Sequence, residues 1–254
     1  LTDAGAVTGN ANVETYVLAD GGGTTFTLGA DAQNVTTGNG ADIVDVGTRT
    51  ATGTFTTVAA DTIKLGNGAD VKGVDSGAGA GGAFTANTLE LASGASVTMT
   101  AAQNNSFTSA TAAGTETIAI SDANDATGLA TIETYTLAAG TQTFTLGATG
   151  QNVTADSTGA TGAITIDTST FTSVTGIFDD NTGDDTIALT LSQDGVNISS
   201  ANTTDVDTIA LANNVGATMT RAQDAKINAA SGTNTVTLTD AGAVTGNANV
   251  ETYV

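Results

Sequence analysis

The sequence contains no cysteine, proline, histidine or tryptophan among its 254 residues. Without cysteine the chain has no disulfides, no thiolate metal ligands and no thiol nucleophile. Without histidine it also lacks the commonest general acid–base group. A serine nucleophile would need an activating base, and no Ser-x-x-Lys motif occurs. We therefore expect a protein that is not an enzyme.

Basic residues are scarce, with five against 26 acidic residues and a formal net charge of −21. They stand singly, so no basic patch is available to neutralise phosphates, and we expect neither nucleic-acid nor anionic membrane partners. No apolar run reaches the length of a membrane span and no signal-peptide pattern occurs, so we expect a soluble chain without membrane insertion. A charge this large repels itself unless cations bind it.

A long internal repeat organises the sequence. Residues 1–17 read LTDAGAVTGNANVETYV, and residues 238–254 carry the same seventeen letters. A looser copy, ISDANDATGLATIETYTL, occupies residues 120–137. The chain therefore reads as a first half-repeat (1–119), a second half-repeat (120–237) and the start of the next full repeat (238–254). Self-similarity of this kind is typical of arrays that bury their core by stacking units.

Short strands with one buried face follow from pairs of apolar residues spaced two apart. The pairs recur about every 23 residues, which predicts roughly ten coils in a 237-residue repeat. Thr is about a fifth of the residues and Gly numbers 32, which suits short strands joined by tight turns. The residues predicted to point inward together are Phe26, Leu28, Ile63, Leu65, Leu89, Leu91, Ile187, Leu189, Ile209 and Leu211.

The fold class that this pattern favours is all-β, a parallel β-solenoid of short strands with Gly, Asn and Asp in the turns. Parallel stacking pairs nearly every strand amide, and the absence of proline leaves those donors available. The alternative is a tandem array of antiparallel β-sandwich domains of about 118 residues each. Two Thr-x-x-Gln capping boxes, at Thr100 and Thr220, predict short helical turns at matching places of the two halves.

Cation binding is the one site chemistry that the motifs support. Residues 37–45 (TGNGADIVD) and 65–73 (LGNGADVKG) place an Asp after closely spaced glycines, and residues 180–188 (DNTGDDTIA) form a poorer copy. Glycines permit the tight turn, and carboxylate oxygens are the ligands that calcium prefers. The alternative is that these are plain Gly-Asp turns. The candidate calcium residues are Asp42, Asp70, Asp185, Gly38, Gly40, Gly66, Gly68 and Gly183.

These turns resemble the calcium-binding nonapeptide G-G-x-G-x-D-x-U-x of repeats-in-toxin (RTX) exoproteins. They depart from it in lacking the first Gly, in placing Lys72 at an apolar position and in not being arranged in tandem. The Thr-, Ala- and Gly-rich acidic chain also resembles surface-layer proteins and giant adhesins of Gram-negative bacteria. That resemblance implies an extracellular or cell-surface location and export by type I secretion.

The function that we expect is structural: an extracellular repeat protein that joins its own copies end to end in a surface layer, sheath or filament, stabilised by calcium. The alternative is a stalk or ligand-binding region of a giant adhesin, with a cell-surface polysaccharide as partner. An ice-binding face would need Thr pairs at one constant spacing per coil, and a polysaccharide lyase would need basic residues along a groove. The sequence offers neither.

Overall fold

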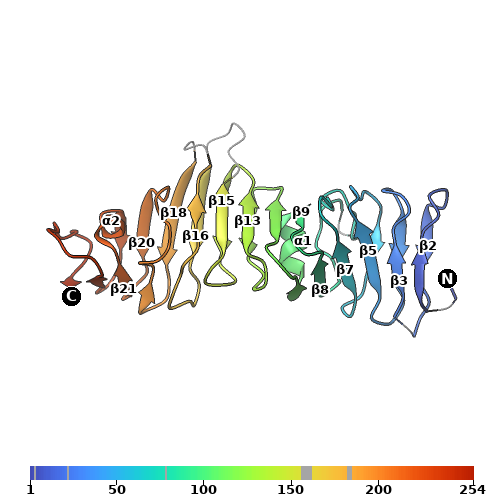
Figure 1. The fold of residues 1–254 in the computed structure, drawn as a ribbon, viewed down its shortest axis with the longest axis horizontal. Helices are drawn as coiled ribbons and strands as arrows, with labels where there is room; N and C mark the ends of the chain where they lie inside the picture. The colour runs from blue at the N-terminus through green and yellow to red at the C-terminus, as the bar shows by residue number, and fades with distance from the viewer. Residues whose placement is uncertain (3, 22, 78, 156–161, 182–184) are drawn as a thin grey trace. The chain divides into compact units, whose positions relative to one another are not determined.

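The computed structural model describes residues 1–2, 4–21, 23–77, 79–155, 162–181 and 185–254. The protein is all-β, with about 4% of its residues in helices, and its parallel strands stack as a β-solenoid of about 12 turns (Figure 1). The chain divides into two compact units, Leu1–Asp122 with Leu129–Thr134, and Ala123–Gly128 with Tyr135–Val254. The predicted parallel β-solenoid is confirmed, and the antiparallel sandwich alternative is wrong.

The first unit places one strand of each coil beside the matching strand of the next coil (Figure 1). One sheet has the order β1 (Ala6–Thr8), β3 (Thr25–Thr27), β5 (Ile43–Gly47), β7 (Thr62–Leu65), β8 (Thr88–Leu91) and β10 (Ser109–Thr111). The other strands of this unit are β2 (Thr15–Val17), β4 (Asn34–Thr36) and β6 (Phe55–Thr56), which form a second sheet, and the pair β9 (Ser96–Met99) and β11 (Thr117–Ile120).

The second unit repeats this arrangement. Its longest sheet has the order β12 (Ala126–Thr127), β14 (Thr141–Thr145), β16 (Ala163–Asp167), β18 (Thr186–Leu191), β20 (Thr208–Leu211) and β22 (Ile227–Ala230). The remaining strands are β13 (Thr134–Leu137), β15 (Asn152–Ala155) and β17 (Phe178–Asp179), followed by a sheet of β19 (Val196–Asn197), β21 (Gly216–Met219), β23 (Thr235–Leu238) and β24 (Thr252–Tyr253).

Each unit has a core built from columns of stacked apolar side chains. In the first unit Phe26 pairs in register with Val44, Val44 with Ile63, and Ile63 with Leu89. The second unit has a matching column of Phe144, Ile166, Leu189 and Ile209. Because parallel strands keep one residue above the next, alternate side chains of every coil enter the same interior. All ten residues predicted to point inward are buried, so that prediction is confirmed.

The predicted coil length is too long. About 12 turns over 254 residues correspond to about 21 residues per turn, against the expected 23. The pattern missed coils whose strands carry small residues, such as β10 with the sequence SAT and β12 with AT. These strands bury too little apolar surface to show a pair of large residues in the sequence, although they pair with their neighbours in register.

Both capping boxes are confirmed. Helix α1 (Ala101–Ser106) begins after Thr100, whose hydroxyl accepts the N–H of Gln103 while the Gln103 side chain accepts the N–H of Thr100. Helix α2 (Arg221–Asp224) has the same reciprocal bonds between Thr220 and Gln223. Within the described ranges, no helix has the length and apolarity that a membrane span requires.

Candidate functional site

The first predicted calcium turn contains a fully buried carboxylate, that of Asp42. Its Oδ1 accepts the N–H of Thr24 at 2.6 Å, and its Oδ2 accepts the N–H of Gly38 at 3.1 Å. Gly38 lies so close to the carbonyl oxygen of Ala19 that a Cβ would overlap with it, while Gly40 lies in the same bend, half-buried. Both carboxylate oxygens therefore already serve backbone donors of this part of the chain.

The second predicted turn pairs its acidic residue with a lysine. Asp70 Oδ2 lies 2.8 Å from the Lys72 ammonium, and Asp70 Oδ1 accepts the Lys72 N–H. Gly66 and Gly68 donate their N–H groups to carbonyls of neighbouring coils, and Gly68 has a φ of +84°, which favours glycine. The lysine ammonium thus stands where the sequence hypothesis places an ion.

The third predicted turn differs from the other two. Asp185 is buried, and its Oδ1 accepts the Gly162 N–H at 2.5 Å, but its Oδ2 has no hydrogen-bond partner among the described residues. Gly183 lies outside the residues that the structure describes. Of the three predicted carboxylates, only that of Asp185 keeps an oxygen without a partner in the described part of the chain.

The aspartates at positions 42 and 185 belong to a larger pattern, which we call the carboxylate ladder. At the start of many strands, the residue just before the strand accepts a backbone N–H located 17 to 23 residues earlier, on the preceding coil. Such bonds satisfy amides that the turn leaves without a strand partner. The ladder residues are seven carboxylates, Asp42, Asp61, Glu116, Glu133, Asp185, Asp207 and Glu251, and one amide, Asn234.

Calcium at Asp42, Asp70 and Asp185 stays a prediction from the sequence, and the orphan oxygen makes Asp185 the residue at which to test it. If an ion binds there, calcium will raise the melting temperature relative to chelator, because a ligand at 100 times its Kd stabilises the folded state by about 2.7 kcal/mol. Asp185→Asn will abolish that rise, whereas Asp31→Asn, which alters an exposed carboxylate outside the three turns, will leave it. Melts with and without calcium, at matched ionic strength, decide it. Equal melting temperatures would contradict the calcium hypothesis.

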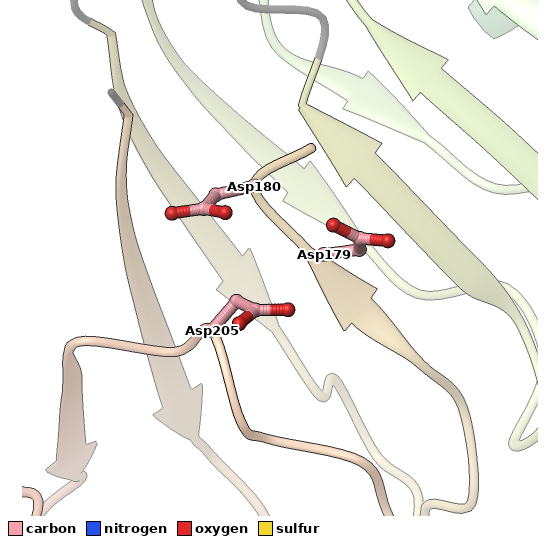
Figure 2. Close-up of side chains that lie close together, drawn as sticks. All are labelled: Asp179, Asp180 and Asp205. Carbon is pink, nitrogen blue, oxygen red and sulfur yellow. The ribbon is translucent and has the colours of Figure 1, made fainter. Parts of the chain in front are cut away.

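The structure also brings together three carboxylates that no sequence motif links. Asp179 is the last residue of β17, Asp180 follows it, and Asp205 comes from the next coil; one oxygen from each lies within 4.8 Å of the others (Figure 2). Asp179 also accepts the N–H of Asn181 at 2.7 Å. The residues lie 25 positions apart in sequence, so only the coil stacking reveals the cluster. Half-exposed carboxylates also gather on acidic proteins without a cation, so the cluster alone assigns no ligand.

The Lys226 ammonium binds the backbone of the turn that contains Asp205. The Lys226 ammonium donates to the carbonyl oxygens of Thr203, Thr204 and Val206 at 2.8, 2.8 and 2.5 Å. The Thr203 carbonyl also accepts the Val206 N–H within this turn, and the lysine binds all three carbonyls together. Lys226 therefore ties the coil that contains it to the preceding coil.

The two identical segments, residues 1–17 and 238–254, share a set of local hydrogen bonds, although residues 6–8 form β1 and residues 243–245 form no strand. We call them the first and second repeat coils. In each, the tyrosine hydroxyl accepts an asparagine N–H, the asparagine side chain accepts an N–H two residues on, and its carbonyl accepts an N–H three residues on. The corresponding pairs are Asn10–Tyr16 and Asn247–Tyr253, Asn10–Asn12 and Asn247–Asn249, and Asn10–Val13 and Asn247–Val250.

Exposed large apolar side chains concentrate in these repeat coils. Six are present among the described residues, and five of them belong to the two segments: Leu1, Val13, Val17, Val244 and Val254. Strands β1 and β2 of the first coil and β24 of the second are edge strands of their sheets. Edge strands with apolar side chains are sites at which another chain can add.

The second repeat coil contacts two titratable side chains that precede it in the sequence, those of Asp224 and Arg221. The Tyr253 hydroxyl donates to Asp224 Oδ1 at 3.0 Å. Burial raises the pKa of Asp224, and the hydrogen bond from Tyr253 opposes that rise. Burial also raises the pKa of the Tyr253 hydroxyl. At the other side of the coil, the Arg221 N–H lowers the pKa of Asp240.

No family model, no curated protein and no solved structure matches this chain.

Proposed function

We propose that the protein is a structural repeat protein of the cell exterior whose copies join end to end into a layer, sheath or filament. The observation that carries the proposal is a parallel β-solenoid in which one seventeen-residue segment recurs with identical sequence and the same local asparagine hydrogen bonds. A segment that recurs in this way allows identical units to follow one another along one axis.

Three further features support a structural role. The coils expose edge strands whose unpaired backbone groups can extend the sheets. The chain has no cysteine, which suits a protein that is stable whatever the redox state outside the cell. Its net charge of −21 opposes unspecific association between its faces.

Charged substitutions in the repeat coils test this proposal. The wild-type chain is expected to form oligomers that grow with concentration, and the double variant Val17→Glu, Val254→Glu to remain monomeric, since a charge on an edge blocks strand addition. The matched control is Ile177→Glu, which alters an exposed large apolar side chain outside both coils and is expected to leave assembly unchanged. Sedimentation velocity and electron microscopy provide the measurement.

A wild-type protein that stays monomeric at every concentration and salt condition would contradict the proposed function. So would equal loss of assembly in the double variant and in Ile177→Glu, because the ends would then have no special role.

A further inference from the structure

The chain contains five Asn-x-Ser/Thr tripeptides, the pattern that enzymes of N-linked glycosylation accept. A chain so rich in threonine acquires such tripeptides easily, and the pattern alone does not rank them. The structure separates them into two classes by what holds each asparagine side chain. The tripeptides begin at Asn34, Asn104, Asn152, Asn197 and Asn202.

Three of the five asparagines are held by the elements that contain them. Asn104 is fully buried in helix α1. Asn34 belongs to β4, half-buried, and its Oδ1 accepts the N–H of Thr54 at 2.8 Å. Asn152 belongs to β15, also half-buried, and its Oδ1 accepts the N–H of Ile177 at 2.9 Å. In a strand the residue two positions on lies about 6.6 Å away, so the threonine of each strand tripeptide stands apart from its asparagine.

The other two asparagines, Asn197 and Asn202, are exposed, and their side chains form the same kind of turn. Asn197 Oδ1 accepts the Ser199 N–H at 2.9 Å and the Ser199 hydroxyl at 2.7 Å. Asn202 Oδ1 accepts the Thr204 N–H at 3.1 Å and the Thr204 hydroxyl at 2.8 Å. Such Asx turns fold the tripeptide back on itself, so that the hydroxyl lies against the asparagine amide.

This turn leaves the amide nitrogen of each of the two side chains free. Within the described ranges, neither the Asn197 Nδ2 nor the Asn202 Nδ2 donates a hydrogen bond. Two donors on Oδ1 draw electron density toward the oxygen, which eases the loss of a proton from Nδ2 when the nitrogen attacks a carbon. The turn therefore exposes the atom that N-linked glycosylation modifies and polarises it.

A polar hollow of about 190 Å³ lies beside Asn202. Its lining includes side chains with hydroxyl groups, those of Ser199, Thr204 and Thr220. Lys226, which also lines it, binds the carbonyl oxygens of the adjoining turn and so holds the wall in place. Sugar hydroxyl groups both donate and accept hydrogen bonds, so a sugar attached at Asn202 finds partners in this hollow.

We propose that Asn197 and Asn202 are acceptor sites at which the folded chain receives an N-linked sugar from a glycosyl diphosphate. A bond forms between the asparagine Nδ2 and the anomeric carbon, and the bond from that carbon to the diphosphate oxygen breaks. The proton that leaves Nδ2 passes to a base of the transferase, and the diphosphate departs with the electron pair, so nothing is oxidised or reduced. The inference uses the proposed location outside the cell, but not the proposed assembly of copies.

The fold accommodates these two additions without losing a bond. Oδ1 accepts both turn hydrogen bonds, whereas glycosylation uses Nδ2, so the Asx turns persist in the product. A transferase that draws out the Asn34 or Asn152 side chain instead leaves a backbone N–H of the next coil without its acceptor. That loss makes the strand tripeptides poorer acceptors in the folded chain.

The test uses the folded full chain and transferases that modify all five tripeptides in unfolded fragments of it. One arm supplies a nucleoside-diphosphate hexose and the other a lipid-linked glycosyl diphosphate, which identifies the donor. Glycopeptide mass spectrometry gives the occupancy of each asparagine. We expect at least about tenfold higher occupancy at Asn197 and Asn202 than at Asn34 and Asn152, since drawing out a strand asparagine costs about 1–3 kcal/mol.

Substitutions of the hydroxyl residues assign each site separately. Ser199→Ala is expected to lose modification at Asn197 alone, and Thr204→Ala at Asn202 alone, because each removes one turn hydroxyl. Ser199→Thr keeps the hydroxyl and is expected to restore the acceptor. The matched control is Ser200→Ala, which alters an exposed hydroxyl residue outside both tripeptides and is expected to leave both occupancies unchanged.

Two outcomes would overturn the inference. Equal occupancy at the strand and turn asparagines of the folded chain would show that the Asx turns select nothing. A folded chain that stays unmodified at Asn197 and Asn202 would show that these turns are not acceptors. Either result leaves the proposed self-association standing, because sedimentation velocity measures it on chains without sugar.

Discussion

Gly147→Ala is expected to destabilise the second unit by at least about 3 kcal/mol, which is larger than the usual cost of an added methyl group. A Cβ at this position would overlap with the carbonyl oxygen of Gly128 on the preceding coil. Backbone atoms cannot rotate out of the way as a side chain can, so the two coils must separate. Separation would also strain the turn, because the Gly147 N–H donates to Gln151 Oε1 at 2.7 Å.

Gly150→Ala supplies the matched control from the same turn. Its nearest neighbour would be the Thr175 hydroxyl at 3.6 Å, which is ordinary contact, and its φ is not in the left-handed region. A change within about 1 kcal/mol is expected, since alanine also restricts the unfolded chain. Chemical denaturation of both variants measures the difference. Similar midpoints for the two would show that the coils are not in close backbone contact at Gly147.

The same turn occurs in the first unit, which shows what a repeat makes predictable. Gly29 and Gln33 stand where Gly147 and Gln151 stand in the second unit, and each glutamine accepts two backbone N–H groups at 2.7 and 3.2 Å. The sequence repeat indicates that these positions are equivalent. It does not reveal that the glycine is needed because another backbone passes above it, since that neighbour lies about one coil away along the chain.

Most of the fold follows from local patterns. Pairs such as Ile63 and Leu65 identify the buried face because strand side chains alternate. The Thr-x-x-Gln motifs identify both helix starts because capping depends only on residues three apart. Strands with small residues, such as β10, carry no such signal, which is why the expected number of coils was too low.

The candidate site was harder to predict because its contacts cross coils. The aspartate at position 42 follows two glycines, so its sequence neighbourhood resembles a calcium turn, yet its oxygens accept the N–H groups of Thr24 and Gly38. The cluster of Asp179, Asp180 and Asp205 joins residues from successive coils. Neither arrangement has a fixed spacing in the sequence, since the coils differ in length. The identity of the two repeat coils was visible from the sequence. The sequence did not reveal that β2 pairs with β4, which follows it, whereas β24 pairs with β23, which precedes it.

Asp61→Ala is expected to destabilise the first unit by about 3–5 kcal/mol, because it leaves several buried donors without an acceptor. Asp61 is fully buried as a member of the carboxylate ladder. Its Oδ1 accepts the N–H of Asp42 at 2.9 Å, and its Oδ2 accepts the N–H of Val58 at 2.7 Å and the hydroxyl of Thr37 at 2.5 Å. Neither N–H can reach solvent without opening the turn that joins two coils.

Two companion variants show whether hydrogen bonding or charge is responsible. Asp61→Asn keeps one acceptor oxygen but turns an amide NH₂ toward donors, so its loss should fall between those of alanine and wild type. Asp31→Ala removes an exposed carboxylate that pairs with Arg49 at 3.3 Å, and a change within about 1 kcal/mol is expected there. Denaturation midpoints at neutral pH give all three values. If Asp61→Ala cost no more than Asp31→Ala, the ladder would be a consequence of coil stacking and would contribute nothing to holding the coils together.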